Sequence, residues 1–427
     1  MKKHTGYYFE RLYRVFFYAL STAIVLWDKA VPTLVVLLML TWIAEGGFKE
    51  KLANVKYRFP FTSVFVAFYV LYLIGLVYSI NLDYGLTDVL LKLPLILLPL
   101  IISSFPKSTF NNHTLYTIPV VFSFTTVAAL ILCYAHAFAG YYQSAYEPIL
   151  YYASLSWFHH PSYLAMFGVF ALSVVIQRLI TNPEKRRTLF KIGMIGAGMI
   201  LFVFIIMLSS RAGILAMMLL FIVTGVYILT EQRKTLLGIL FLGLFIIGFY
   251  IAYLSFPIAF GRLSHTKDVL QAQTINQNTE DGTAQRILIW EAATDVIKDN
   301  LLLGVGTGDV KDELIKAYKI KGMATTASGN KNAHNQYIQT FAAIGLTGLI
   351  VLILSLLLPG LIAIKQHNLL YFLFLTNVGL NFLFESMLER QAGVIFFSLF
   401  NIVLFVLHQQ TKPALRSLMQ DENTGQN

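Results

Sequence analysis

Three residues of this chain have side chains suited to group-transfer chemistry. His334 lies in the run Ala333-His334-Asn335-Gln336-Tyr337-Ile338-Gln339, where a polar stretch gives way to an apolar one. An imidazole with an ordinary pKa of about 6.5 can take up a proton at neutral pH, so His334 is a candidate general base. Arg211 and Arg286 are candidates for binding a diphosphate, because the planar guanidinium donates paired hydrogen bonds to phosphate oxygens.

Five further side chains are candidates for substrate binding or for supporting the first three: His159, His160, Glu385, Glu389 and Arg390. The two histidines precede Pro161, an order that is also typical of a helix start. Glu385 and Glu389 are one helical turn apart with Arg390 adjacent, which favours ion pairing within that turn. A histidine pair without spaced carboxylates or cysteines does not make a metal-ligand pattern, so we expect no metal site.

A glycine-rich stretch, Gly304-Val305-Gly306-Thr307-Gly308, also needs an explanation. It lacks the lysine of a nucleotide-binding P-loop and follows no strand of a βαβ unit. We expect it to form a turn that lets the backbone approach a helix or a substrate closely.

The composition places these residues in a membrane protein. Of 427 residues, 57% are hydrophobic and 13% are charged, whereas a soluble domain carries about 25% charged residues. The mean hydropathy is +0.66. The single cysteine, Cys133, excludes a disulfide framework. The basic residues near the start precede an apolar run without a small-residue cleavage site, so we expect a retained first helix.

The sequence predicts an all-α polytopic membrane protein with about twelve transmembrane helices. Nine fall in residues 1–255 and three in 335–408, before a cytoplasmic tail at 409–427. Residues 256–334 form one long polar loop. Within it we expect an amphipathic helix over 284–298 on the membrane surface, a short helix over 310–318, and irregular chain over 322–332. The predicted spans are 11–27, 31–45, 61–80, 84–104, 115–138, 160–180, 188–208, 211–230, 236–255, 335–363, 366–384 and 391–408.

Lysines and arginines predict the orientation of these spans. With the N-terminus inside, the cytoplasmic segments hold 19 of the 32 basic residues, and the short external segments hold only Lys29, Arg211 and Arg390. This asymmetry predicts cytoplasmic termini and an external 256–334 loop. The net charge of +10 is then mostly a signal of topology, and we expect no nucleic-acid partner.

All the candidate residues fall on the external face in this topology, although other residues determined it. Each also has an ordinary explanation. Arg211 could extend from a helix end to the membrane surface, Arg286 could touch lipid head groups, and His334 could be a solvated residue at a helix start. Because all of these residues are predicted on the same side of the membrane, a shared site is favoured.

Several motifs together resemble the O-antigen ligase family and its relatives, the Wzy-type polymerases. The motifs are Ser209-Ser210-Arg211-Ala212-Gly213, Arg286-Ile287-Leu288-Ile289-Trp290, Asn300-Leu301-Leu302-Leu303-Gly304-Val305-Gly306-Thr307-Gly308, His334-Asn335-Gln336-Tyr337-Ile338-Gln339 and Gly345-Leu346-Thr347-Gly348-Leu349. Their order and approximate spacing fit, and so does the long loop ahead of the histidine. The resemblance is sharp only over about residues 205–350, and it separates members of the superfamily poorly.

The resemblance implies an inverting, metal-independent glycosyltransferase of GT-C type that needs no cofactor. It implies transfer of a glycan from undecaprenyl diphosphate to an acceptor hydroxyl at the periplasmic face of the bacterial inner membrane. Arg211 and Arg286 would hold the diphosphate, and His334 would deprotonate the acceptor. Two cations can stabilise the leaving diphosphate without a metal.

Alternatives for the acceptor stay open. The chain length and the expected absence of a further soluble domain favour a ligase acting on lipid A-core in lipopolysaccharide synthesis. A polymerase joining repeat units and a transferase to protein serine or threonine use the same chemistry. A transporter or flippase of lipid-linked sugars would bury charges near mid-membrane and show repeat symmetry. Here the charges gather at one face, so transport is the weaker hypothesis.

Overall fold

The structure, a computed structural model, describes residues 2–106, 112–144, 150–181, 188–257, 260–261, 269 and 275–424, and these residues contain helices but no strand. Much of the first part of the predicted loop, from 258 to 274, lies outside this description. The helices before the loop are α1 (Lys2–Leu26), η1 (Asp28–Ala30), α2 (Val31–Glu45), α3 (Phe48–Val77), α4 (Leu82–Lys92), α5 (Pro94–Ser104), α6 (Asn112–Ser144), α7 (Tyr152–Leu155), α8 (Pro161–Ile180), α9 (Thr188–Met207), α10 (Arg211–Thr230) and α11 (Thr235–Ser255). Those after it are α13 (Gly282–Asp299), α14 (Val310–Ile320), α15 (Ala324–Ser328), α16 (Gln336–Lys365), α17 (Leu369–Phe384), η3 (Met387–Glu389) and α18 (Gln391–Thr424).

The chain is a polytopic helical membrane protein. Among the described residues, seven helical segments are long and apolar enough to cross a membrane by length and composition. An eighth segment would be the pair formed by residues 28–45 and 48–59, which is bent by 118°. Residues 61–77, 369–384 and 391–407 form shorter apolar helices. A helix thus lies over each predicted apolar segment, while twelve membrane crossings stay a prediction.

The segment predicted at 84–104 is one apolar span, Leu82–Ser104. It consists of α4 and α5, which meet at Leu93 ahead of Pro94, and Leu93 keeps helical φ and ψ. Proline has no backbone N–H, so a helical hydrogen bond is lost at this position. Helix α4 carries side chains of the site described below.

Helix α8 forms the centre of the bundle. Its residues 161–176 are all buried, and it packs against α6, α9, α10 and α17. Phenylalanines of α6, α8, α17 and α18 interlock here: Phe170 contacts Phe122, Phe374 and Phe400 with ring centroids 4.8–5.6 Å apart. Burial of large rings makes this core a fixed support for the helix ends around it.

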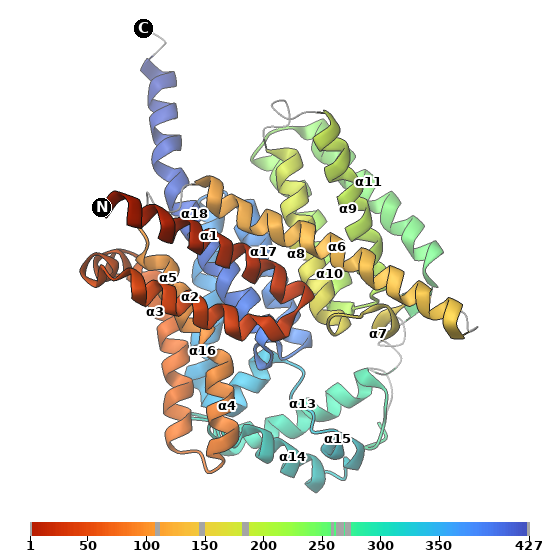
Figure 1. Cartoon of the computed structure of the whole chain (residues 1–427). Coiled ribbons are helices and arrows are strands. Elements are labelled where there is room, and N and C mark those ends of the chain that lie inside the picture. Colours follow the sequence, from red (N-terminus) through yellow and green to blue (C-terminus); the bar gives the residue numbers. More distant parts are fainter. Residues whose placement is uncertain are drawn as a thin grey trace.

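The helices of the loop, α13, α14 and α15, lie together at one end of the molecule, whereas the C-terminal part of α18 projects from the opposite end (Figure 1). We call the end that holds α13, α14 and α15 the loop end. The expected helices at 284–298 and 310–318 are present, but two expectations were wrong. The apolar face of α13 packs against α14 and α16, so protein covers it where we expected lipid. Residues 324–328 form α15 where we expected irregular chain, and Thr326 at its centre is buried beside Gln285.

The glycine-rich stretch fixes the loop to the bundle. The N–H groups of Val305 and Gly306 donate to Ala342 and Ala343 of α16, and Thr307 donates to the backbone of α3 through its N–H and its hydroxyl. A Cβ on Gly308 would lie 2.2 Å from the carbonyl oxygen of Asn81. The stretch therefore makes the close backbone approach that we expected, and its neighbours are helices.

The Asp309 carboxylate extends this attachment. It accepts hydrogen bonds of 2.7–3.0 Å from the N–H groups of Ile80 and Asn81, in the turn between α3 and α4. Asn81 in turn donates to Asp312 of α14 over 2.7 Å. These bonds hold α14 against the start of α4.

Helix α16 bends where the glycine-rich stretch meets it. Gly345 has φ 67° and ψ −166°, a region that is essentially restricted to glycine. The bend exposes the N–H of Leu346, which donates to the carbonyl of Leu301. One interrupted helix thus receives the loop by backbone hydrogen bonds.

Replacement of Gly345 by alanine should destabilise the protein. The backbone conformation alone would cost about 1–3 kcal/mol, and the added Cβ would lie 2.2 Å from the carbonyl oxygen of Leu302. The thermal midpoint of the purified protein in detergent should fall. Gly360→Ala in the same helix is the matched control, because its Cβ would meet nothing within 4 Å. Equal midpoints for the two variants would contradict this account.

Candidate functional site

His334 lies at the loop end, two residues before α16 begins. Its φ of 46° is left-handed, which is uncommon for a residue with a Cβ and has an energetic cost. Its N–H donates to the Asn332 side chain over 3.0 Å. The surrounding chain must hold this conformation, because the residue by itself prefers another.

The polar residues around His334 supply that support. Gln339 accepts the N–H of Ala333 at 3.0 Å, and the Trp290 indole of α13 donates to the Ala333 carbonyl at 2.9 Å. Asn335 caps α16 by accepting from Tyr337 and Ile338. The Gln336 side chain accepts the N–H of Leu388 at 2.7 Å. The amides of the histidine motif thus serve to position the histidine.

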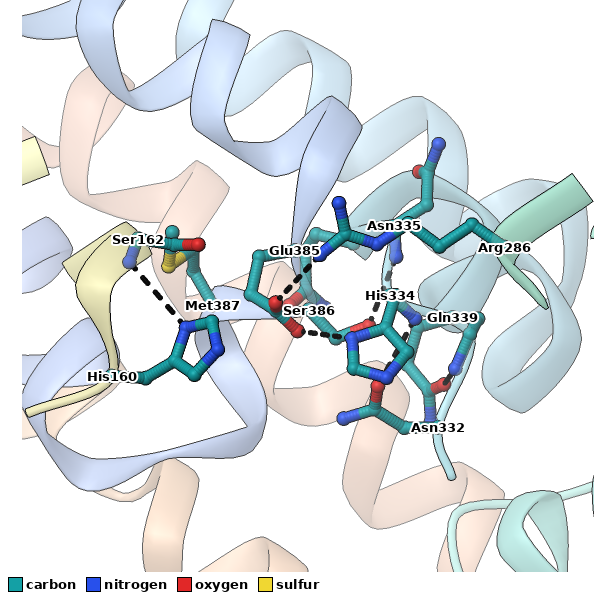
Figure 2. A network of polar contacts seen from close by, with 12 residues as sticks. His160, Ser162, Arg286, Asn332, His334, Asn335, Gln339, Glu385, Ser386 and Met387 are labelled. Atoms are coloured by element: carbon teal, nitrogen blue, oxygen red, sulfur yellow. Dashed lines mark hydrogen bonds and ion pairs between the residues drawn. The ribbon is translucent and has the colours of Figure 1, made fainter. Parts of the chain in front are cut away.

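Glu385 joins the two most prominent candidates. It follows the last residue of α17, and its carboxylate Oε1 lies 2.7 Å from His334 Nδ1 while Oε2 lies 3.3 Å from Arg286 Nη2 (Figure 2). The Glu385 side chain is 8% exposed, whereas those of His334 and Arg286 are 24% and 20% exposed. One buried carboxylate therefore holds an accessible imidazole and an accessible guanidinium on adjacent sides.

The charges around Glu385 keep it ionised. Burial by itself raises the pKa of this carboxyl, but the hydrogen bond from His334 and the positive charge of Arg286 lower the pKa below its usual value. A buried carboxylate is stable only when it is paired in this way. At neutral pH the group is a fixed negative charge.

His159 and His160 have different surroundings. His159 Nε2 lies 3.1 Å from the carbonyl oxygen of Val25 at the end of α1, and its ring packs edge-on against Phe167. These two contacts are structural, and His159 also lines the cavity described below. His160 caps α8, and its Nδ1 accepts a hydrogen bond from the N–H of Ser162. Burial, together with the positive charges of Arg286, His334 and Arg390, lowers the pKa of His160, so this ring is neutral at pH 7.

Arg211 begins α10 and comes to the same end of the bundle. Ser210 caps the helix by accepting from Gly213, and Gly213 is so close to α8 that a Cβ would lie 2.5 Å from that of Ala165. Since Ala165 is in the first turns of α8, the starts of α8 and α10 are level. Arg211 and His160 therefore lie at the same end of adjacent helices.

The predicted ion pairing within the Glu385–Arg390 turn was wrong, because the ion pairs found in the described residues reach other elements. Glu385 pairs with His334 and Arg286, and Glu389 Oε1 pairs with Lys92 Nζ of α4 at 3.0 Å. Lys92 is fully buried and also pairs with Asp88. The reason is that residues 387–389 form a 3₁₀ turn, so the expected spacing of an α-helix does not apply.

A cavity of about 740 Å³ opens beside this site. It is lined by residues from both sides of the loop end, among them His160, Asn332, Gln339, Asp88, Glu389 and Arg390. Asn332 and Gln339 are the same side chains that hold the His334 segment. A molecule in the cavity would therefore lie next to side chains that position the histidine, although His334 itself is not among the lining residues.

The arrangement can promote attack by a hydroxyl group. With Nδ1 donating to Glu385, Nε2 of His334 is the nitrogen left to take a proton, and Glu385 stabilises the imidazolium that forms. Arg286 offers its other N–H groups to an anion formed nearby. In the described residues no group of three or more His, Cys, Asp or Glu side chains is placed to hold a metal ion.

Sequence reasoning found His334 and Arg286 but did not find how they are connected. It placed Glu385 only among supporting candidates, and it did not single out Asp88, Asn332 or Gln339. One signal was available, because a carboxylate at the end of an apolar helix needs a partner. Nothing in the sequence spacing shows that this partner is 51 residues away.

Comparison with known proteins gives two matches. Residues 196–353 match the family described as O-Antigen ligase; this stretch holds Arg211, Arg286 and His334 but not Asp88 or Glu385. An uncharacterized protein of Haemophilus influenzae is 37% identical over 93 residues, which are 22% of this chain and 23% of that protein. The aligned part is thus less than a quarter of that relative's length.

Replacement of Glu385 by glutamine should change how stability depends on pH. The folded-state pKa of Glu385 is below its ordinary 4.5, so its contribution is fully present above that value and is lost as the pH falls through the folded-state pKa. Wild type should be more stable than Glu385→Gln by about 1–3 kcal/mol at pH 6, and the difference should shrink below about pH 4.

Thermal midpoints in detergent over this pH range measure the effect. Glu313→Gln, which removes a carboxylate from the surface of α14, is the control. A difference between wild type and Glu385→Gln that does not change with pH would contradict the assignment.

Proposed function

Because the chain belongs to the O-antigen ligase and Wzy superfamily, we propose that it is a membrane glycosyltransferase that moves a glycan from undecaprenyl diphosphate to an acceptor hydroxyl. The proposed acceptor is lipid A-core, and the proposed place is the periplasmic face of the bacterial inner membrane. The reaction inverts the anomeric centre and uses no metal or cofactor. The observation that carries the proposal is the Glu385 carboxylate bridging His334 and Arg286.

His334 is the proposed general base. Glu385 accepts from Nδ1, which leaves Nε2 to take the proton from the acceptor hydroxyl as its oxygen attacks the anomeric carbon. The new carbon–oxygen bond forms while the bond to the diphosphate oxygen breaks, and the proton stays on the imidazole. The negative Glu385 stabilises the positive imidazolium.

Arg286 and Arg211 are the proposed diphosphate ligands. Arg286 uses Nη2 for Glu385, and a guanidinium has four further N–H donors that can contact phosphate oxygens. The leaving diphosphate gains negative charge as the bond breaks, so fixed cations lower the barrier. A site at a helix end also suits a donor whose lipid tail stays in the bilayer.

The orientation follows from the charge asymmetry. We place both termini in the cytoplasm and the loop end in the periplasm, because basic residues favour cytoplasmic segments. The structure supports a single site, since His334, Arg286, Glu385, His160 and Arg390 are close enough to influence each other electrostatically.

A lipid-linked sugar transporter remains the competing class. The buried pair Lys92 and Asp88 is a feature that a transporter could use. However, Lys92 also pairs with Glu389 in the turn after α17, so this charge group belongs to the loop end with the rest of the site. A polymerase and a protein-directed transferase would use the same residues.

Removal of any proposed active-site side chain should abolish transfer. Arg211→Ala and Arg286→Ala should each lower the rate by about 10²–10³-fold, and His334→Ala by about 10²–10⁴-fold. The measurement is transfer from purified lipid-linked glycan to core acceptor in the presence of EDTA. Lys298→Ala, an exposed change on the same helix as Arg286, and His367→Ala, in an exposed pair with Glu231, should stay fully active. An active His334→Ala would remove the base assignment.

A deletion strain distinguishes the acceptors. Gel analysis of its lipopolysaccharide and glycoproteins should show unsubstituted core, with free undecaprenyl-linked polymer accumulating. Core bearing a single repeat unit would indicate a polymerase instead, and underglycosylated proteins would indicate a protein-directed transferase. Loss of the polymer from the periplasm, with intact transfer by the purified protein, would indicate a separate defect in transport.

A further inference from the structure

A buried lysine between two carboxylates lies beside the proposed active site. Lys92 is fully buried, pairs with Asp88 of its own helix and with Glu389 Oε1 at 3.0 Å, and lies 4.7 Å from the centre of the Tyr72 ring. Burial of three charges is costly unless the geometry is good. The transfer step described above uses none of these residues.

The two carboxylates face the cavity of about 740 Å³. Asp88 and Glu389 both line it, whereas Lys92 lies behind them. Lys92 contacts one oxygen of each group, Asp88 Oδ1 and Glu389 Oε1. In the part of the chain that the structure describes, no hydrogen bond to Asp88 Oδ2 or Glu389 Oε2 is formed. An ionised carboxylate oxygen can only accept, so these atoms are suited to hydroxyl donors.

The rest of the wall fits a sugar ring. Tyr84, Trp157 and Tyr163 contribute aromatic side chains to it, and the amides of Asn332 and Gln339 can both donate and accept. Lys311 of α14 lies 5.6 Å from the centre of the Tyr84 ring of α4, so the loop contributes one side of the cavity. The volume is in the usual range of small-ligand sites, about 300–1,000 Å³.

The cavity lies where an attacking hydroxyl must come from. Asn332 and Gln339 line it and also accept hydrogen bonds from the backbone N–H groups of His334 and Ala333. His160, neutral at pH 7, is on the same wall. A sugar in the cavity would thus present a hydroxyl toward the His334 segment.

We infer that this cavity binds the terminal sugar of the acceptor glycan, and that Asp88 and Glu389 accept hydrogen bonds from its hydroxyls. The inference rests on the proposed function. The sugar binds through its hydroxyl groups, because Lys92 is already shared by the two carboxylates and their other oxygens are left to accept. Lys92 is a positioning residue that holds both carboxylates at the wall.

Direct binding tests this inference. The probe is an oligosaccharide with a neutral terminal hexose, titrated into the full-length protein in detergent by calorimetry. Asp88→Asn and Glu389→Gln should each weaken binding about tenfold or more, because each removes an acceptor that is charged. Each variant leaves Lys92 one carboxylate partner, so the fold is retained. Asp83→Asn, an exposed change on the same helix, should bind as wild type does.

Two results of the binding experiment would overturn the inference: no binding by wild type, or equal binding by all four proteins. Failure of the proposed function gives a different result. Wild type would then transfer no glycan but would still bind the oligosaccharide, because the binding experiment contains no donor. In the transfer assay the two variants should raise the acceptor KM and leave the donor KM unchanged. A change in donor KM of the same size would place these residues on the donor side and overturn the assignment.

Discussion

The buried Glu385 carboxylate is the interaction on which the functional end of this molecule depends. It fixes the imidazole of His334 and the guanidinium of Arg286 through separate oxygens, and these side chains come from three parts of the chain. Because this carboxylate is buried, water cannot solvate its charge, and it must keep its two partners. The pairing therefore holds α13, the start of α16 and the end of α17 in one arrangement. It also explains how His334 can keep a left-handed backbone conformation, since the surrounding contacts determine it.

The glycine-rich stretch has the corresponding role on the backbone. It attaches the loop to α3 and to the bend of α16 by main-chain hydrogen bonds, and Asp309 holds the turn before α4. These contacts bring α14 against α4, so that Lys311 and Asp88 line one cavity. Residues 311–332 of the loop therefore contribute to the cavity wall, beside helices whose cores interlock through aromatic rings. An imidazole, a guanidinium group and a polar cavity therefore lie at one end of an apolar bundle.

Much of the fold and part of the site could be predicted from sequence. Apolar runs of membrane length located the helices closely, because the bilayer imposes their length. Polar residues that are costly near lipid identified His334, Arg286 and Arg211 as candidates, and Gly304 to Gly308 was expected to approach another backbone. The partners could not be predicted in the same way. Because residues 387–389 form a short 3₁₀ turn, Glu385 and Glu389 pair with residues of different elements. Helical spacing had suggested a local ion pair with Arg390.

The sequence by itself thus determined the class of molecule, the positions of its helices and the types of side chain available for chemistry, because these depend on composition and local periodicity. Only the tertiary structure decided that Glu385 joins His334 to Arg286, that protein covers the apolar face of α13, and that Asp88 and Glu389 share Lys92 beside a cavity. Each of these depends on contacts between residues far apart in the chain. Such contacts are determined by how whole helices pack, and they cannot be predicted from local sequence patterns.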